Sequence, residues 1–197
     1  VEAMDKIKES GIASRRCFVV ETMGRDCGYL ALMSGIAAGA ERIYTNEDGI
    51  SLDDLANDVH WLRESFAHGR RLFLAVRNEN ASHNYTTDFI ARLLEEESHG
   101  MYDVRQVVLG HMQQGGSPSP FDRLLANRLG YRALNLIDDE LAAHQDGSWF
   151  IGVNESGMRP CSMDTMPSLI DAAHRRPREQ WWLQLRTIAR MVSDEVR

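Results

Sequence analysis

The chain has little cysteine and no long hydrophobic run, and both absences narrow the classes of protein to which it can belong. Its three cysteines, Cys17, Cys27 and Cys161, form no CxxC pair and no spacing typical of a zinc site. An odd number at so few positions favours a reducing compartment, so we expect a cytoplasmic protein. No run reaches the about 18 apolar residues of a membrane span, and no signal peptide is visible.

An excess of basic residues is also absent. The 22 Lys and Arg residues are outnumbered by 29 Asp and Glu residues, which gives a formal net charge of -7. Nucleic acids and anionic membranes need a broad basic surface, so neither is an expected partner. The sequence also lacks GxGxxG after its first predicted strand and lacks GxxxxGK[ST], so it has neither a dinucleotide fingerprint nor a P-loop. Any phosphate ligand must be bound by a local group of arginines.

Short apolar runs alternate with segments of helical pattern along the chain. Strands are predicted at 17–20, 42–44, 72–76, 104–109 and 149–153, and helices at 4–11, 29–40, 51–69, 87–97 and 121–141. This alternation predicts parallel βαβ units, and hence an α/β fold with an open, mostly parallel sheet covered by helices on both faces. We expect one domain over 1–197, with no linker that divides it and with helical stretches from about 165 to the C-terminus. Because the chain opens at Val1 in a helical pattern, we also expect it to be a segment of a longer protein.

Three local patterns refine this prediction. The segment 29–40 is rich in Ala and Gly, which allows a helix to approach a sheet closely. Ser51 to Asp54 resembles a capping box with Asp in place of Glu, so a helix should start there. Trp181 and Trp182 are most simply packing anchors.

Polar side chains gather on three of the predicted strands and directly after them. They are Arg16, Arg25, Glu79, Arg105, His111 and Gln114. Parallel sheets bind ligands at the carboxyl ends of their strands. Arginine forks and histidine suit a phosphate, while a carboxylate or an amide suits sugar hydroxyls. The pattern therefore favours a phosphate-binding α/β domain.

Each of these residues also has a structural interpretation that the sequence leaves open. His111 can be a structural hydrogen-bonding residue after a strand. Arg16 stands beside Arg15 as in a solvated pair, and Arg105 can form an ion pair with a neighbour on its strand. Residues 115–118 are typical of a turn.

Several longer segments resemble the phosphofructokinase family. The segments at 18–24 (FVVETMG), 108–118 (VLGHMQQGGSP) and 120–123 (PFDR) are similar to that family's fructose-phosphate motifs. The segments at 77–80 (RNEN), 84–89 (NYTTDF) and 177–183 (PREQWWL) look specifically like the C-terminal half of the long eukaryotic-type enzymes. The resemblance extends from about residue 14 to residue 193, and motifs of this length are highly specific.

The resemblance implies roles for the matched residues. Arg16 and Arg105 look like the pair that reaches across a subunit interface to the 6-phosphate of the sugar, assisted by His111. Glu79 matches the family's carboxylate that accepts hydrogen bonds from sugar hydroxyls. Arg175 resembles an arginine near the end of the family's sequence that also reaches the ligand phosphate. The matched ligand-binding residues are Arg16, Met23, Gly24, Arg25, Glu79, Arg105, His111, Met112, Gln113, Gln114 and Arg175. The resemblance implies neither a metal ligand nor a catalytic residue in this segment.

Three departures from the family pattern bear on turnover. Gln114 stands where catalytic halves usually carry arginine, and an amide cannot provide the second charged fork that a transferring phosphoryl group needs. Arg25 stands where many regulatory halves have glycine. In this respect the site resembles that of a catalytic half. The family's Gly-Gly-Asp-Gly-Ser nucleotide loop and its Thr-Ile-Asp-Asp/Asn segment, which carries the proton-accepting aspartate, are absent from these residues.

These departures favour a segment of 6-phosphofructokinase that binds but does not catalyse. ATP and Mg²⁺ belong to the parent enzyme and its nucleotide-binding lobe, and we expect this segment alone to bind neither. The expected ligand is the activator fructose 2,6-bisphosphate, and the expected partners are the rest of the enzyme and neighbouring subunits of a homo-oligomer, a tetramer. Two alternatives stay open: the catalytic fructose 6-phosphate subdomain of a short enzyme, and a non-catalytic assembly module.

Overall fold

The computed structural model describes residues 1–11, 13–154 and 157–194, and the chain forms two compact units. The first comprises residues 1–114 and those from 180 onward, and we call it the sheet unit. The second comprises residues 115–179, and we call it the helix–hairpin unit. All but one of the predicted ligand-binding residues belong to the sheet unit.

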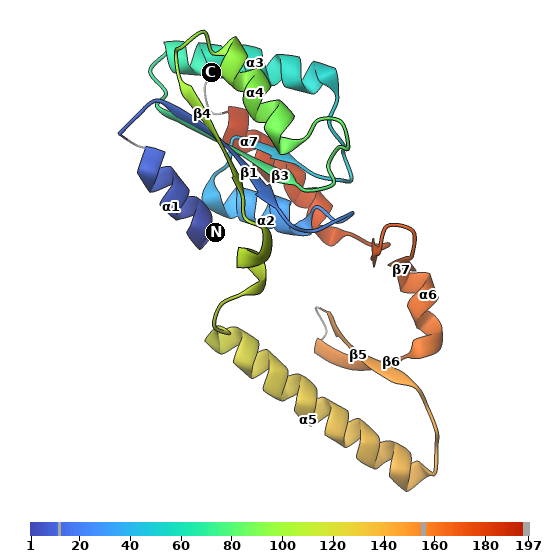
Figure 1. The fold of residues 1–197 in the computed structure, drawn as a ribbon. Helices are drawn as coiled ribbons and strands as arrows, with labels where there is room; N and C mark the ends of the chain where they lie inside the picture. The colour runs from blue at the N-terminus through green and yellow to red at the C-terminus, as the bar shows by residue number, and fades with distance from the viewer. Residues whose placement is uncertain (12, 155–156, 195–197) are drawn as a thin grey trace. The chain divides into compact units, whose positions relative to one another are not determined.

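The sheet unit is built on four parallel strands in the order β2-β3-β1-β4 (Figure 1). They are β1 (Arg16–Thr22), β2 (Arg42–Tyr44), β3 (Leu72–Asn78) and β4 (Asp103–Val108). Each coincides with a predicted strand, and the central strands β1 and β3 lie on continuous apolar runs. The two central strands, β1 and β3, are buried over most of their length, which explains why their sequences are continuously apolar and do not alternate.

Helices cover both faces of this sheet, which confirms the predicted fold class. The helices of this unit are α1 (Glu2–Gly11), α2 (Tyr29–Ala38), α3 (Leu52–Ala67), α4 (Thr87–Glu97) and α7 (Arg186–Asp194), with the 3-10 helices η1 (Gly110–Gln114) and η3 (Trp181–Leu185). Side chains of α3 and α4 pack with Cys17 and Val19 of β1, and those of α1 and α2 pack with Phe18 and Val20. Figure 1 shows α3 and α4 on one side of the sheet and α1 and α2 on the other. Alternate residues of β1 therefore point to opposite faces of the sheet, where they belong to two separate hydrophobic cores.

Local chemistry decides where two of the helices begin and how closely one approaches the sheet. Ser51 forms the predicted capping box with Asp54, so α3 begins at Leu52. The side chain of Thr86 accepts a hydrogen bond from the backbone amide of Phe89, and α4 begins at Thr87, directly after this cap. In α2, a Cβ added to Gly35 would lie 2.6 Å from Cδ1 of Ile43, which confirms the predicted close approach to the sheet.

The C-terminal residues return to the sheet unit, where η3 and α7 pack against α2. Trp182 is only 5% exposed, and its ring lies edge-on to that of Tyr29 with 5.0 Å between centroids. It is the packing anchor that the sequence predicted. Trp181, in contrast, is largely exposed, although its ring also lies near Tyr29.

The helix–hairpin unit corrects one prediction. It contains α5 (Pro120–Ala143), β5 (Trp149–Asn154), β6 (Gly157–Ser162), η2 (Met163–Thr165), α6 (Met166–Leu169), β7 (Ile170–Asp171) and β8 (Arg176–Pro177). The strand predicted at 149–153 exists as β5, but it pairs antiparallel with β6 and is not the last strand of the parallel sheet. Antiparallel pairing needs only a short connection, and β6 follows β5 almost at once.

Helical stretches were expected from about residue 165, and the described residues there form α6, η3 and α7, with the β7–β8 pair between α6 and η3. Within its own unit, α5 buries none of its residues, and several large apolar side chains along it are more than half exposed, including Phe121 and Tyr131. No described helix combines the length and the apolar character needed to cross a membrane.

Candidate sugar-phosphate site

Three of the parallel strands end side by side at one edge of the sheet. The register pairs Thr22 at the end of β1 with Asn78 at the end of β3. It also pairs Glu21 with Val108 at the end of β4. The segments that follow these strands therefore start from a common edge, which is the edge where parallel sheets bind ligands.

The loop after β1, residues 23–25, has an unusual backbone. Gly24 has φ +151°, and an added Cβ would lie 2.5 Å from the carbonyl oxygen of Cys27 and 2.7 Å from Nδ2 of Asn78. Arg25 has φ +46°, a left-handed conformation that costs a residue with a side chain about 1–2 kcal/mol. A backbone of this kind persists only where its surroundings hold it.

Two side chains from the neighbouring strand ends hold this loop. Oε1 of Glu79 accepts from the amides of Gly24, at 3.0 Å, and Arg25, at 2.6 Å. Oε1 of Gln113 accepts from the amide of Met23 at 2.7 Å. The backbone amides of residues 23, 24 and 25 are thus all hydrogen-bonded to side chains outside the loop. These contacts bring together five of the predicted ligand-binding residues: Met23, Gly24, Arg25, Glu79 and Gln113.

The contacts of Glu79 and Gln113 are more specific than the sequence indicated. Both were predicted to bind the ligand, and in the structure each places one side-chain oxygen on the loop backbone. Within the described part of the chain, the second carboxylate oxygen of Glu79, Oε2, has no hydrogen-bond partner. The carboxylate can therefore hold the loop and accept from a hydroxyl at the same time.

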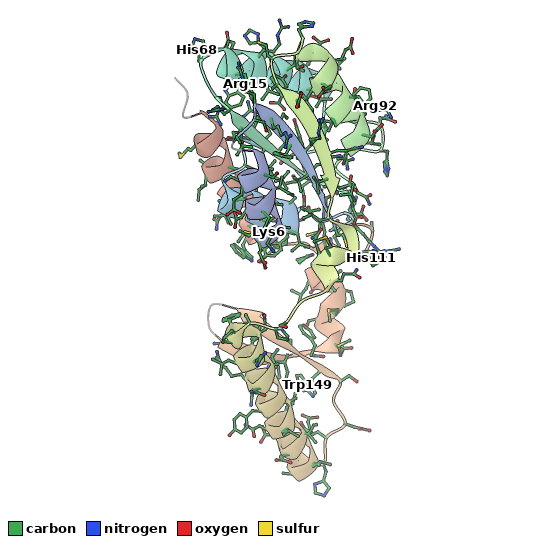
Figure 2. All side chains as sticks on the ribbon, turned by 60° about the vertical axis from the view of Figure 1, so that its left-hand side comes forward. Lys6, Arg15, His68, Arg92, His111 and Trp149 are labelled. Atoms are coloured by element: carbon green, nitrogen blue, oxygen red, sulfur yellow. The ribbon has the colours of Figure 1, made fainter. Side chains whose placement is uncertain are left out.

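The 3-10 helix η1 follows β4 at the same edge. Its side chains at 111, 112 and 114 are exposed, and Met112 is 74% exposed. Figure 2 shows His111 at the end of the sheet unit where β4 finishes. His111, Met112 and Gln114 are thus accessible beside the loop that Gln113 holds.

Arg16 and Arg105 lie away from this edge, although the sequence grouped them with it. Arg16 begins β1, six residues before Thr22, which corresponds to about 20 Å along a strand. Arg105 lies inside β4, and its Nη2 is 3.8 Å from the carboxylate of Asp103, the neighbour pairing that was the structural alternative. The register pairs Arg16 with Asp103, so both arginines lie on the same face of adjacent strands.

Arg175 belongs to the helix–hairpin unit, in the turn between β7 and β8, where it has φ +52°. The same turn is organised by Asp171, whose carboxylate contacts Nδ1 of His174 at 2.7 Å and the amides of Ala173 and His174. The hydrogen bond from His174 and these amides lower the pKa of Asp171.

Two residues at the ligand edge were not singled out from the sequence. Both oxygens of the Glu47 carboxylate lie 3.0 Å from the amide of Gly28, at the start of α2. A helix start attracts anions, so this carboxylate occupies a position that a phosphate could otherwise use. The second is Arg77 at the end of β3, which is only 1% exposed. The sequence signal for Arg77 is its position directly after the apolar strand residues 72–76.

Among the residues that the structure describes, no group of three or more His, Cys, Asp or Glu side chains is arranged so that it could hold a metal ion. The exposed side chains at the ligand edge include the guanidinium of Arg25, the ring of His111 and the amide of Gln114, and the carboxylate of Glu79 lies beside them. This set suits a phosphorylated, hydroxyl-bearing ligand more than a hard cation, which needs several oxygen ligands.

Comparison with known proteins agrees with the fold. The family model described as Phosphofructokinase matches residues 1–137. An ATP-dependent 6-phosphofructokinase of Dictyostelium discoideum is 41% identical over 195 residues, which are 98% of this chain and 23% of that protein. The muscle-type ATP-dependent 6-phosphofructokinase of Homo sapiens is 42% identical over 200 residues, with 96% of this chain and 26% of that protein covered.

A solved structure of phosphofructokinase from Saccharomyces cerevisiae superimposes on 99% of this chain with a TM-score of 0.92 and 33% identity. It is also longer, since the match covers 27% of that chain. The chain thus spans about a quarter of the length of the relatives it matches. With the family model covering more than half of its residues, the chain belongs to the phosphofructokinase family.

Proposed function

We propose that this chain is the sugar-phosphate-binding part of the C-terminal, regulatory half of an ATP-dependent 6-phosphofructokinase, and that it binds the activator fructose 2,6-bisphosphate. The observation that carries the proposal is the meeting of residues 23–25, Glu79 and η1 at one edge of the sheet. The parent enzyme would transfer the γ-phosphoryl group of ATP to fructose 6-phosphate with Mg²⁺, as a cytoplasmic step of glycolysis. This segment would supply only the sugar-phosphate side of that enzyme.

Each side chain at the edge has a role that fits such a ligand. The exposed Arg25 guanidinium and the His111 ring would bind a phosphate group, because charge-assisted hydrogen bonds contribute about 1.5–3 kcal/mol each. Oε2 of Glu79 would accept from a sugar hydroxyl. The backbone of 23–25 would line the sugar, in the conformation that Glu79 and Gln113 hold.

Gln114 supports an effector site over a catalytic one. Its amide is exposed at the end of η1, where catalytic halves of the family usually carry arginine. A neutral amide can bind a stationary phosphate, but it does not stabilise the charge of a transferring phosphoryl group as a guanidinium does.

The position of Arg16 and Arg105 supports a site shared between subunits of a homo-oligomer, a tetramer. β4 is an edge strand, and Arg105 is more than half exposed on it. The Nε atom of Arg16 is buried and has no hydrogen-bond partner within the described residues. Both arginines would bind the phosphate in the neighbouring subunit's site, while Arg175 would assist as the resemblance implies.

Calorimetric titration tests the choice of ligand. The chain is titrated with fructose 2,6-bisphosphate, fructose 6-phosphate and ATP in parallel, and the first is expected to bind most tightly. Tighter binding of fructose 6-phosphate would favour the catalytic subdomain. Binding of neither sugar by a folded oligomer would favour an assembly module.

A further inference from the structure

A buried arginine lies directly behind the proposed site. Arg77 is the largest of the side chains that are almost fully buried, with 1% exposure. Burial lowers its pKa, and the nearby Glu21 carboxylate opposes that shift. A buried charge is tolerated only when it is paired and its hydrogen-bonding groups are satisfied, so the partners of this guanidinium show what it does.

Arg77 forms an ion pair with a residue of the neighbouring strand. Nη1 of Arg77 is 2.9 Å from Oε2 of Glu21 on β1, and the two residues are register partners. The Thr87 hydroxyl, at the start of α4, donates to the same Glu21 oxygen and lies 3.4 Å from Nη1 of Arg77. The ion pair therefore connects the ends of β1 and β3 with the first turn of α4.

The remaining donors of Arg77 bind the backbone of the segment between β3 and α4. Nη1 donates to the carbonyl of Glu79 at 3.0 Å, Nη2 to that of Ser82 at 2.6 Å, and Nε to that of Tyr85 at 3.1 Å. The three carbonyls are spaced three residues apart, so the segment 79–85 wraps around one guanidinium. Arginine can do this because its five N–H groups form a fixed planar fork, whereas lysine carries a single point charge.

Glu79 stands where this segment meets the site. Its amide donates to the carbonyl of Thr22 at 3.0 Å, and its own carbonyl accepts from Arg77. Its carboxylate accepts from the amides of Gly24 and Arg25. With its backbone fixed on both sides, the carboxylate has little freedom to leave the loop.

We propose that Arg77 is a positioning residue: it holds the segment 79–85 so that the Glu79 carboxylate stays on the amides of residues 24 and 25. Through Glu79 it determines the affinity of the sugar-phosphate site, a last step that rests on the proposed function. Arg77 itself contacts neither the loop 23–25 nor η1 through any described hydrogen bond or ion pair.

The test combines a conservative variant with two measurements. Arg77→Lys keeps a charge for Glu21 but cannot bind all three carbonyls. Amide hydrogen exchange at residues 24 and 25, followed by NMR, is expected to accelerate by about tenfold or more, because the acceptor on these amides becomes mobile. Calorimetric titration with fructose 2,6-bisphosphate is expected to show binding about tenfold weaker.

Arg92→Lys is the matched control. Arg92 lies exposed on α4, where its Nε forms a surface pair with Asp88 at 3.0 Å, and Figure 2 shows it pointing away from the sheet. This variant is expected to leave both measurements unchanged. If Arg77→Lys does not fold, Thr87→Val replaces it, because it removes one hydroxyl of the same network without moving the charge.

A double-mutant cycle separates positioning from general stability. If Arg77 acts through Glu79, Arg77→Lys has almost no further effect on affinity once Glu79→Ala is present. An equal loss of affinity in both backgrounds, or unchanged exchange at residues 24 and 25 with a lowered Tm, would overturn the proposal. If the unaltered chain binds no sugar phosphate, the proposed function fails, and the exchange measurement still decides whether Arg77 positions Glu79.

Discussion

The sharpest single perturbation of the proposed site is Glu79→Gln, because it removes a charge while keeping the shape of the side chain. The glutamine carbonyl oxygen can still accept from the amides of Gly24 and Arg25, so the loop 23–25 should keep its backbone. What is lost is a charged acceptor for the sugar hydroxyl, which contributes about 1.5–3 kcal/mol. We therefore expect binding of fructose 2,6-bisphosphate to weaken by about 10- to 150-fold.

Stability should respond much less to this change. The side chain is partly exposed and its two backbone contacts survive, so the free energy of unfolding should fall by less than about 1 kcal/mol. Calorimetric titration and a thermal melt of the same sample measure both quantities. Glu79→Ala is the companion variant, and it should lower both the affinity and the Tm because it also frees the loop amides. Unchanged affinity of Glu79→Gln with a lowered Tm would refute the ligand role and leave Glu79 as a purely structural residue.

Two further predictions concern the parent enzyme. The chain alone should show only background turnover in a coupled assay with ATP, Mg²⁺ and fructose 6-phosphate, because its sequence lacks the nucleotide loop and the proton-accepting aspartate; robust turnover by pure protein would contradict this. If Arg16 and Arg105 serve a neighbouring subunit, binding of fructose 2,6-bisphosphate should strengthen with protein concentration as light scattering reports assembly, and a lone subunit should bind at least about 100-fold more weakly. Tight binding by a monomer that Arg16→Ala does not affect would refute the shared site.

The elements that the sequence predicted well are those specified by neighbouring residues. Ser51 and Thr86 cap α3 and α4 by accepting hydrogen bonds from backbone amides three residues further on. The start of each helix is therefore determined by residues close to it in the sequence. The central strands β1 and β3 follow from continuous apolar runs, which are typical of strands covered on both faces. The pairing of β5 was not predictable in this way, because an isolated apolar run does not reveal whether its partner is parallel or antiparallel.

The candidate site divides in the same manner. Chain order and parallel topology were enough to place Met23, Gly24, Glu79 and His111 at one edge. The resemblance grouped Arg105 with that edge, although it lies near the start of the predicted strand 104–109, as it does in β4. Chain order and topology could not show that Arg77 is buried, since its carbonyl partners become neighbours only when the segment after β3 folds back.

The discontinuity of the sheet unit has a consequence for the order in which the protein is made. All four parallel strands have been synthesised by residue 108, but Trp182 and α7 follow only after the 65 residues from 115 to 179. At about 5–20 residues per second, translation of that insertion takes about 3 to 13 s. During this interval the nascent sheet can close over its two cores, while Tyr29 and the apolar surface of α2 stay open to solvent. Until α7 emerges, that surface is open to chaperones and to mispairing.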